Sequence, residues 1–380
     1  MLIFWIILVW VSLFGIIGTH IKKDVVLVEG YELNKVNLFM AILVMVVIVF
    51  FAGLRSGVAD TGAYISWFNS MPNNFNDIPG YLRQEEKDLG FVLLSSIFKT
   101  LLSSDYQVWL FAIVTLSCIP IFKTLYKYSV NYFFSMFLFV TSCYFTWLFN
   151  GARQFLVAAL LFGCFRLIIK KKTITFLIVV ILLSTVHASA VILIPVYFIV
   201  NTEPWGRKMS VFSIMIILSV VFVDKLLNVF NGAISDTPYS VMTEQFKVDD
   251  GVNIIRVLFE AVPVMIAFWN RKYIKKIAPE YIKIAINMSM IAVGFFLLGT
   301  VTSGIFIGRM PIYFSLYNLI LIPWLLTNVF SKKSKLIVYY MFIIIYLVFF
   351  FYQMVIAWAG FGYISEVLNI YRRWMTNYFY

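Results

Sequence analysis

Residues 174–200 read ITFLIVVILLSTVHASAVILIPVYFIV. The run is almost wholly apolar, with a small polar break, VHAS, in its middle at 186–189. A helix needs about 20 apolar residues to cross the ~30 Å hydrocarbon core of a bilayer, so a run of about 27 is too long for a simple span. It forms either one long tilted helix or two half-helices that fold back at His187. Both alternatives predict a membrane protein.

Similar apolar runs recur along the rest of the chain. Of the 380 residues, 62% are hydrophobic and 13% are charged, whereas a soluble domain carries about a quarter charged residues. This composition excludes a water-soluble or nucleic-acid-binding protein. We therefore predict an all-α polytopic membrane protein with about 10–11 transmembrane helices, forming one integral membrane domain over 1–380. The other expected spans are 2–19, 38–54, 106–122, 131–149, 154–169, 254–269, 282–299, 311–329 and 336–357, with a shorter one at 210–223.

Basic residues orient these spans. The formal charge of +12 could point to a polyanionic partner. We favour the simpler explanation of the positive-inside rule, because Lys and Arg accumulate in cytoplasmic loops. The basic segments 123–127, 166–172, 271–283 and 332–335 should therefore all be cytoplasmic. The number of crossings between 166–172 and 271–283 must then be even.

Three crossings, at 174–200, 210–223 and 254–269, would violate this requirement. If 174–200 is a re-entrant hairpin, the number falls to two; the alternative is that 210–223 does not cross. Each arm of the hairpin would be about 18–20 Å long, which brings His187 well across the bilayer toward the outer side. Since non-helical backbone at that depth must be buried in protein or line a wet cavity, the hairpin implies a cavity at His187.

Two long loops, 55–105 and 224–253, lie outside under this topology. The first contains an amphipathic stretch near 90–102, expected as a helix lying at the membrane interface. Apolar residues of this stretch share one helical face: Phe91, Leu94, Ile97, Phe98 and Leu101. The second loop has turn-forming residues and no apolar periodicity.

Isolated polar side chains gather on the outer side of this topology. They are Arg55, Asp60, Arg153, His187 and Arg309. Charged groups at bilayer depth are costly and usually face a cavity. Each residue also has a simpler interpretation. An arginine at a helix end can anchor to lipid headgroups, Asp60 can cap the helix that follows it, and His187 can be a packed polar residue.

Metal ligands are scarce in this sequence. The only histidines are His20 and His187, and the three cysteines lie inside apolar runs without metal or disulfide spacing. Several arginines suit a phosphate or diphosphate group, which guanidinium binds through two parallel hydrogen bonds. Such donors can stabilise a departing pyrophosphate while a carboxylate or imidazole takes a proton from an attacking hydroxyl. These residues fit glycosyl transfer from a lipid-diphosphate donor, and an ion or metabolite transporter fits the composition equally well.

Short motifs surround the same residues. They are GLRSGVADTGAY at 53–64, DLGF at 88–91, NGARQ at 150–154, HASA at 187–190, and Arg309 followed by Tyr313 and Phe314. In order and spacing, over about 50–325, these motifs resemble the EpsG family of Wzy-like polysaccharide polymerases. The chain departs from the family pattern at Ala59, where a glycine is usual, and at Leu89, where a proline is common.

By this resemblance, the protein would polymerise oligosaccharide repeat units linked to undecaprenyl diphosphate. The reaction would take place at the outer face of the bacterial cytoplasmic (inner) membrane. The growing chain is the donor, a new lipid-linked repeat is the acceptor, and the lipid diphosphate leaves. The resemblance implies no metal and no cofactor. A chain-length regulator and a flippase are expected partners besides membrane lipids. The product can be an O-antigen, a capsule or an exopolysaccharide.

The resemblance also implies roles for the candidate site residues. Arg153 and Arg309 would bind the diphosphate, with Arg153 stabilising its departure and Arg55 in support. Asp60 and His187 are rival candidates for the catalytic base. The remaining candidates would orient sugars or neighbouring site residues: Tyr64, Asp88 and Gln154.

Three other activities stay open. A lipid-linked polysaccharide ligase uses the same donor, but its usual mark is a very long late periplasmic loop, and 224–253 is only moderate. A membrane acyltransferase acting on glycans calls for an early intramembrane histidine, and His20 lies at a span end without polar neighbours. A transporter of polysaccharide or lipid-linked sugars favours pseudo-symmetric halves with paired broken helices, whereas this chain has one broken segment without a counterpart.

Overall fold

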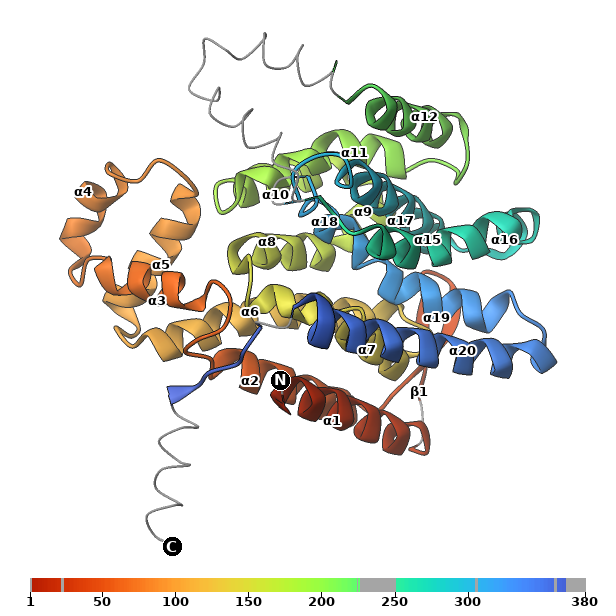
Figure 1. Ribbon diagram of the computed structural model, residues 1–380, viewed down its shortest axis with the longest axis horizontal. Coiled ribbons are helices and arrows are strands. Elements are labelled where there is room, and N and C mark those ends of the chain that lie inside the picture. The colour runs from red at the N-terminus through yellow and green to blue at the C-terminus, as the bar shows by residue number, and fades with distance from the viewer. Residues whose placement is uncertain are drawn as a thin grey trace, which may run out of the picture. The chain divides into compact units, whose positions relative to one another are not determined.

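The computed structural model describes residues 2–21, 24–223, 225, 251–304, 307–358 and 361–366. In this part of the chain nearly all regular elements are helices (Figure 1). The predicted all-α class is therefore confirmed. The second predicted outer loop, 224–253, lies almost entirely outside the described residues.

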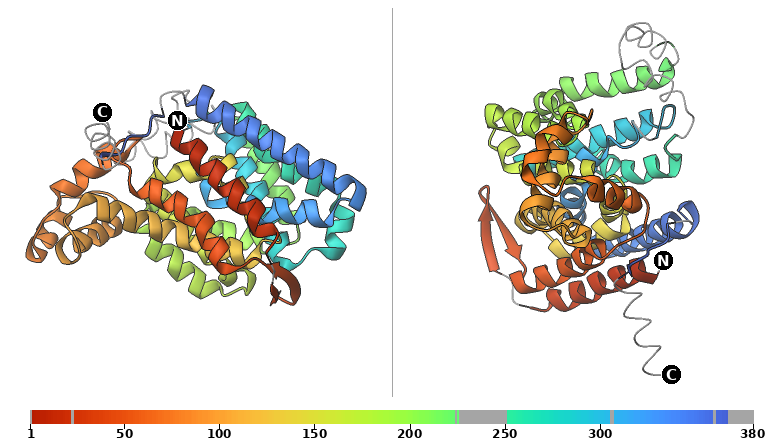
Figure 2. Two further views of the ribbon diagram at one scale, coloured as in Figure 1. Left: turned by 90° about the horizontal axis from the view of Figure 1, so that it is seen from below. Right: turned by 90° about the vertical axis from the view of Figure 1, so that its left-hand side faces the viewer.

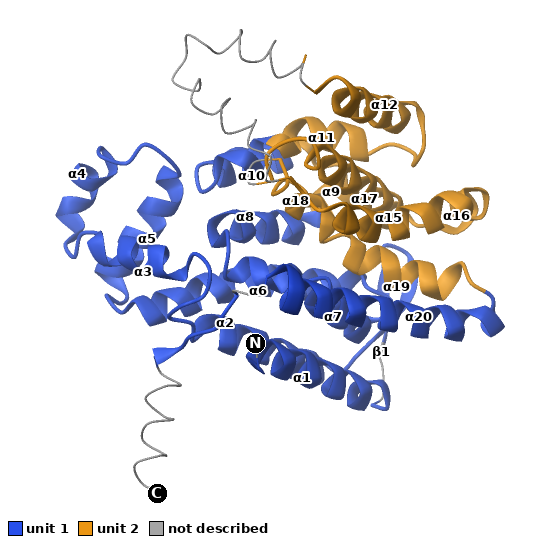
Figure 3. Ribbon diagram, in the orientation of Figure 1, with its two compact units in different colours: residues 1–165, 174–191, 331–380 blue, residues 166–173, 192–330 orange. Residues whose placement is uncertain are grey.

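Two compact units divide the chain (Figure 3). Unit 1 comprises Met1–Phe165, Ile174–Val191 and Ser331–Tyr380, and unit 2 comprises Arg166–Thr173 and Ile192–Phe330. Unit 1 is assembled from segments that are far apart in the sequence, whereas only Ile174–Val191 separates the two segments of unit 2. That the whole chain forms one integral membrane domain stays a prediction.

The helices of unit 1 are α1 (Leu2–Thr19), α2 (Leu38–Gly53), α3 (Thr61–Ser70), α4 (Ile78–Leu82), α5 (Leu89–Leu101), α6 (Tyr106–Tyr128), α7 (Tyr132–Thr141), α8 (Ala152–Gly163) and α20 (Lys332–Phe351), which a π-helical turn, Tyr352–Ala357, extends. Unit 1 also contains the 3-10 helices Phe75–Asp77 and Tyr144–Leu148. The helices of unit 2 are α11 (Leu193–Val200), α12 (Arg207–Val221), α15 (Ile254–Trp269), α16 (Arg271–Ile277), α17 (Glu280–Leu298), α18 (Ile312–Ser315) and α19 (Asn318–Asn328). Three boundaries between the units fall within α9 (Phe165–Ile169), α10 (Thr173–Ser184) and the 3-10 helix Ala188–Ile192, and the fourth falls between α19 and α20.

Several of these helices are suited to a bilayer. In the described residues, four are long and apolar enough to cross a membrane by length and composition: α1, α6, α17, and α20 with its π-helical turn. Shorter apolar helices occupy most of the other predicted spans, among them α2, α7, α8 and α10. The protein is therefore a multi-pass membrane protein, as the hydropathy predicts.

The 174–200 run folds back on itself. α10 and α11 are separated by a break that contains His187. Thr173 Oγ1 and Tyr197 Oη, 24 residues apart in the chain, lie at hydrogen-bonding distance, 2.9 Å. A straight helix of that length would separate them by about 36 Å. The hairpin alternative is confirmed, and the single long helix is wrong.

The predicted interfacial helix forms as α5, within one residue of its expected bounds. Phe91 of its apolar face is buried, whereas Leu94 and Leu101 are 56% and 64% exposed. On the buried side, Lys99 Nζ donates to three backbone carbonyls at the C-terminal end of α3, at 2.6–3.0 Å. The exposed leucines suit a helix that lies on a membrane, because lipid can cover them.

A β-hairpin precedes α2 and was not expected from the sequence. Strands β1 (Asp24–Val28) and β2 (Tyr31–Lys35) pair antiparallel. Glu29 and Gly30 form the turn with φ of 51° and 86°, the left-handed values that a tight two-residue hairpin requires. Figure 2 shows the two strands projecting beyond the ends of α1 and α2. Lys35 Nζ donates to the Lys127 carbonyl at 2.5 Å, which ties the hairpin to the end of α6.

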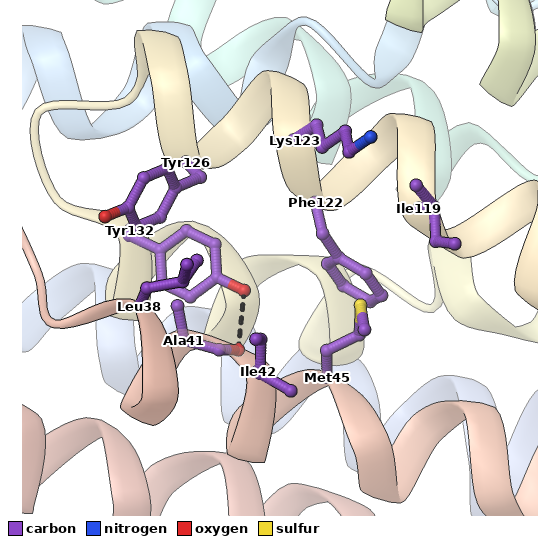
Figure 4. A pocket seen from close by; sticks show the side chains of 9 residues that line it. All are labelled: Leu38, Ala41, Ile42, Met45, Ile119, Phe122, Lys123, Tyr126 and Tyr132. Carbon is purple, nitrogen blue, oxygen red and sulfur yellow. Dashed lines mark hydrogen bonds between the residues drawn. The ribbon is translucent and has the colours of Figure 1, made fainter.

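An apolar cavity of about 390 Å³ lies between α2 and α6 (Figure 4). Tyr132 closes one side and donates to the Ala41 carbonyl at 3.0 Å. Lys123 is the one charged residue in the lining. Because the lining offers almost no polar chemistry, this cavity is not a candidate for glycosyl transfer.

A polar chain lies inside unit 2, where α15, α17 and α19 pack together. Arg256 Nη2 is 2.9 Å from Glu260 Oε1, and Asn318 Nδ2 donates to Glu260 Oε2 at 2.8 Å. Ser289 Oγ donates in turn to Asn318 Oδ1 at 2.6 Å. Glu260 is only 2% exposed, so its charge is compensated within the bundle, as a buried carboxylate requires.

Candidate functional site

Asp88 lies where two separate parts of unit 1 meet. It precedes α5 with φ of 54°, a left-handed backbone value. Two residues later, the Gly90 amide donates to the Thr185 carbonyl at 2.8 Å. A Cβ on Gly90 would lie 2.8 Å from the carbonyl carbon of Thr185, so only glycine permits this approach. The contact brings the start of α5 against the hairpin break that carries His187.

The Asp88 carboxylate lies between two cationic or ionisable side chains. Its Oδ2 is 3.0 Å from Arg153 Nη1 and 3.4 Å from His187 Nδ1. The Asp88 side chain is 10% exposed, whereas Arg153 and His187 are 38% and 27% exposed. The carboxylate is thus covered, and the guanidinium and imidazole open outward. We call these three residues the Asp88 cluster.

Opposing effects act on the Asp88 carboxyl. Burial alone would raise its pKa. The hydrogen bond and charge of His187, the charge of Arg153 and the Ala188 amide outweigh burial, so the pKa lies below its ordinary value. The carboxylate is therefore ionised at neutral pH and can orient the imidazole.

Three aromatic rings surround the Arg153 guanidinium. The Cζ atom lies 5.8 Å from the centre of Tyr64 and 5.9 Å from the centres of Trp67 and Phe91. Trp67 stacks on Phe91, with centroids 5.5 Å apart and planes 9° apart, and its Nε1 donates to Glu85 at 3.4 Å. Tyr64 Oη also accepts from the Arg153 backbone amide at 3.3 Å. These cation–π contacts hold the guanidinium in one place.

Asp60 occupies the position before α3, as a helix cap would, but its side chain does not cap that helix. Its Oδ2 instead accepts from the Gly151 amide at 3.0 Å. Gly151 has φ of 76° and immediately precedes α8, the helix that begins with Ala152 and Arg153. Asp60 therefore fixes the turn before α8, and this turn positions Arg153 in the Asp88 cluster.

Gln154 follows Arg153 on α8 but points into the interior. It is 4% exposed, and its Nε2 lies 3.5 Å from Ser189 Oγ, in the same motif as His187. This contact links α8 to the hairpin break a second time.

Arg55 follows α2 at the start of the 55–105 segment and is buried, with 1% exposure. Its Nε donates to Thr61 Oγ1 at 3.1 Å, its Nη1 donates to the Ala52 carbonyl, and its guanidinium lies 5.7 Å from the Phe149 ring centre. These contacts are all internal. They fix the turn between α2 and α3, which carries Asp60.

Residues 361–366 clamp the same turn from the other end of unit 1. The Ser56 and Gly57 amides donate to the Ile364 carbonyl at 2.9 and 3.1 Å, and the Ile364 amide donates back to Gly57 at 2.7 Å. Tyr363 Oη donates to the Phe51 carbonyl at 2.8 Å. Sequence reasoning missed this clamp, and it missed Trp67, because neither stands in a recognisable motif.

Arg309 belongs to unit 2, in the turn before α18. The other sequence-predicted site residues, namely Arg55, Asp60, Tyr64, Asp88, Arg153, Gln154 and His187, all belong to unit 1 and are linked by the contacts above. The place of Arg309 beside them stays a prediction.

The fold and the Asp88 cluster define a multi-pass membrane protein with a histidine–carboxylate–arginine site. The chain belongs to the EpsG family, whose family model matches residues 38–365. This family is related to the Wzy-like polymerases, which suggests a role as a polysaccharide polymerase. The resemblance predicted from the motifs is confirmed, and the match extends into the 361–366 clamp. No curated protein and no solved structure shows significant similarity to the chain.

Proposed function

We propose that this protein joins oligosaccharide repeat units carried on undecaprenyl diphosphate, at the outer face of the bacterial cytoplasmic membrane. One observation carries the proposal. Three motifs that are distant in sequence converge on Asp88, which contacts both Arg153 and His187. The arrangement combines a partly exposed guanidinium for a diphosphate with an imidazole for a hydroxyl proton.

His187 is the proposed base. Nδ1 faces the Asp88 carboxylate at 3.4 Å, so a proton on Nδ1 leaves the Nε2 lone pair free. The carboxylate orients the ring and stabilises the imidazolium that forms when Nε2 accepts a proton. Of the two rival candidates, His187 is favoured over Asp60 because the Asp60 carboxylate is engaged by the Gly151 amide.

Arg153 is the proposed ligand of the leaving group. Its guanidinium has five N–H donors, and the contact with Asp88 involves one terminal nitrogen. The remaining donors can bind diphosphate oxygens, and the side chain is 38% exposed. The ring contacts of Tyr64, Trp67 and Phe91 preorganise these donors, which is what electrostatic stabilisation of a developing charge requires.

The proposed reaction is a single displacement. The acceptor hydroxyl oxygen forms a bond to the anomeric carbon of the donor sugar as its proton passes to His187 Nε2. The bond from that carbon to the diphosphate oxygen breaks, and the lipid diphosphate leaves with the electron pair. Arg153 offsets the charge on the departing oxygens, and Arg309 is a proposed second ligand for them.

The test is glycan length on a gel from a strain that lacks this gene. The strain is complemented with wild type, Arg153→Ala or Arg83→Ala at matched membrane protein levels. Arg83 is an exposed arginine of the predicted outer loop 55–105 and serves as the control. We expect single repeat units in the null and the Arg153→Ala strains and a full ladder with Arg83→Ala. A full ladder in the null strain would disprove the polymerase. A normal ladder of unligated glycan, with loss of transfer to the final acceptor, would identify a ligase instead.

A further inference from the structure

A basic pocket of about 340 Å³ lies in unit 2, between the 203–206 loop, α16 and the start of α17. Its basic lining residues are Arg271, Lys272, Lys275 and Lys283. Glu203 is the acidic residue of the lining, and its Oε1 pairs with Lys283 Nζ at 2.6 Å. The other three cations have no carboxylate partner within the described ranges. The pocket therefore carries an uncompensated positive charge.

Buried contacts fix the 203–206 loop, which forms one wall of this pocket beside the exposed basic residues of α16. Asn287 is fully buried, and its Nδ2 donates to two backbone carbonyls of the segment before the loop, at 2.9 and 2.7 Å. Trp205 packs edge to face on Phe268 of α15, with centroids 6.1 Å apart. A Cβ on Gly206 would lie 2.8 Å from the Glu203 carbonyl oxygen, so the turn needs glycine there. The loop is thus fixed against both α15 and α17.

The pocket lies beside the end of α15 and the start of α17. Lys283 lies in the first turn of α17, one of the helices long enough to span a bilayer. α15 ends beside it with Phe268 and Trp269, which are 45% and 76% exposed. Exposed aromatic residues at helix ends are typical of the headgroup region. Further along α15, the exposed Leu258 and Met265 continue an apolar surface away from the pocket.

We propose that the pocket binds the phosphodiester headgroup of an anionic phospholipid, with its acyl chains lying along α15. Basic pockets between transmembrane helices on the cytoplasmic side suit such headgroups. Arg271 Nη1 donates to the Phe268 carbonyl at 3.2 Å, which leaves its other guanidinium donors for phosphate oxygens. Lys272 and Lys275 supply point charges. The positive-inside rule explains why basic residues lie in 271–283, but it does not require them to line one fixed pocket. The proposal does not depend on the proposed polymerase activity.

Native mass spectrometry of the full chain in detergent tests the proposal. The protein is titrated with phosphatidylglycerol or with phosphatidylcholine of the same acyl chains, and in a third arm with glycerol 3-phosphate alone. The test variant is Arg271→Gln with Lys275→Gln, two exposed residues of α16. The control is Lys332→Gln with Lys333→Gln, which removes the same amount of positive charge from two exposed lysines at the start of α20. A second variant, Arg271→Lys with Lys275→Arg, keeps the charge.

We expect wild type to prefer phosphatidylglycerol and the Gln pair to weaken its binding about 30-fold, since each basic residue near anionic lipid contributes on the order of fivefold. The control and the charge-conserving variant should keep wild-type binding. Equal binding by wild type and the Gln pair, or no preference between the lipids in wild type, would overturn the proposal. Glycerol 3-phosphate binding as tight as phosphatidylglycerol would overturn the lipid assignment in favour of a soluble anion. Identical thermal unfolding of all variants shows that the fold is retained.

Discussion

The Gly90 amide donates a hydrogen bond to the Thr185 carbonyl at 2.8 Å. This backbone contact joins the start of α5 to the break of the re-entrant hairpin. Asp88 and His187 each lie two residues from it, so it determines how the carboxylate meets the imidazole. The site therefore depends on a glycine that carries no chemistry itself.

Gly90→Ala should separate these two segments. The added Cβ would lie 2.8 Å from the Thr185 carbonyl carbon, and overpacking of this kind costs about 1–3 kcal/mol. We expect a lower unfolding temperature and at least a tenfold loss of polymer synthesis, estimated from the same overpacking. Gly80→Ala is the matched control, because a Cβ there meets nothing within 4 Å. Wild-type activity in Gly90→Ala would show that the Asp88–His187 geometry is not needed.

Arg153→Lys should reduce activity about 100-fold or more while leaving membrane insertion intact. Lysine keeps the charge but cannot form the two parallel hydrogen bonds of a guanidinium. Removal of one hydrogen-bond donor to a developing charge typically lowers the rate by about this factor. The rate of repeat-unit joining in purified membranes measures the effect. Arg83→Lys makes the same change at an exposed site outside the Asp88 cluster and should leave the activity unchanged. Full activity in Arg153→Lys contradicts the diphosphate role.

Asp60→Asn and His187→Gln distinguish the two rival bases. The asparagine side-chain oxygen can still accept from the Gly151 amide, so Asp60→Asn should keep activity within about tenfold of wild type. His187→Gln removes the proposed base and should lower the rate about 100-fold or more. Rates at saturating acceptor, with circular dichroism to check folding, give the comparison. The opposite order of effects would make Asp60 the base.

The lowered pKa of Asp88 predicts an acid-dependent loss of stability. Folding favours its ionised form, so the stabilisation is fully present above the ordinary carboxyl pKa of about 3.9. It is lost as the pH falls through the lower folded value. Asp88→Asn should therefore unfold at a lower temperature than wild type at neutral pH. This gap between the two unfolding temperatures should narrow on acidification below about pH 4.

Thermal unfolding in detergent between about pH 7 and pH 3 measures this gap. Asp77→Asn is the control, since Asp77 is exposed and its described contact is with neutral Asn74. A gap that stays constant with pH would mean that the Asp88 charge does not contribute to stability.

Charge and hydropathy predicted much of this fold because a bilayer restricts where apolar and basic residues can lie in the sequence. The requirement for an even number of crossings favoured the hairpin, and the Thr173–Tyr197 contact confirms it. Hydropathy says less about which face of a helix packs inside. Leu94 and Leu101 of α5 are exposed while Lys99 is buried, because lipid can cover leucine and backbone carbonyls can satisfy an ammonium group.

The motifs identified all three residues of the Asp88 cluster but did not predict which of them contacts the other two. Asp88 was expected to orient sugars or neighbouring site residues, and the structure places it in contact with both Arg153 and His187. Such pairing depends on a backbone contact between Gly90 and Thr185, which no local pattern encodes. The β1–β2 hairpin was missed because its strands are short and follow directly on an apolar helix.

The clamp between Ser56 and residues 361–366 has a consequence for biosynthesis. The Glu366 amide donates to Ser56 Oγ at 2.9 Å, across 310 residues of sequence. During translation the 55–105 segment emerges early, and residues 361–366, which pair with it, emerge only after α20 has been made. The segment that carries Asp60 therefore lacks its hydrogen bonds to residues 364 and 366 during most of synthesis. A ribosome that stops before residue 364 would release a product with many of its membrane helices and an unfinished site, so completion of the chain and assembly of the site are coupled.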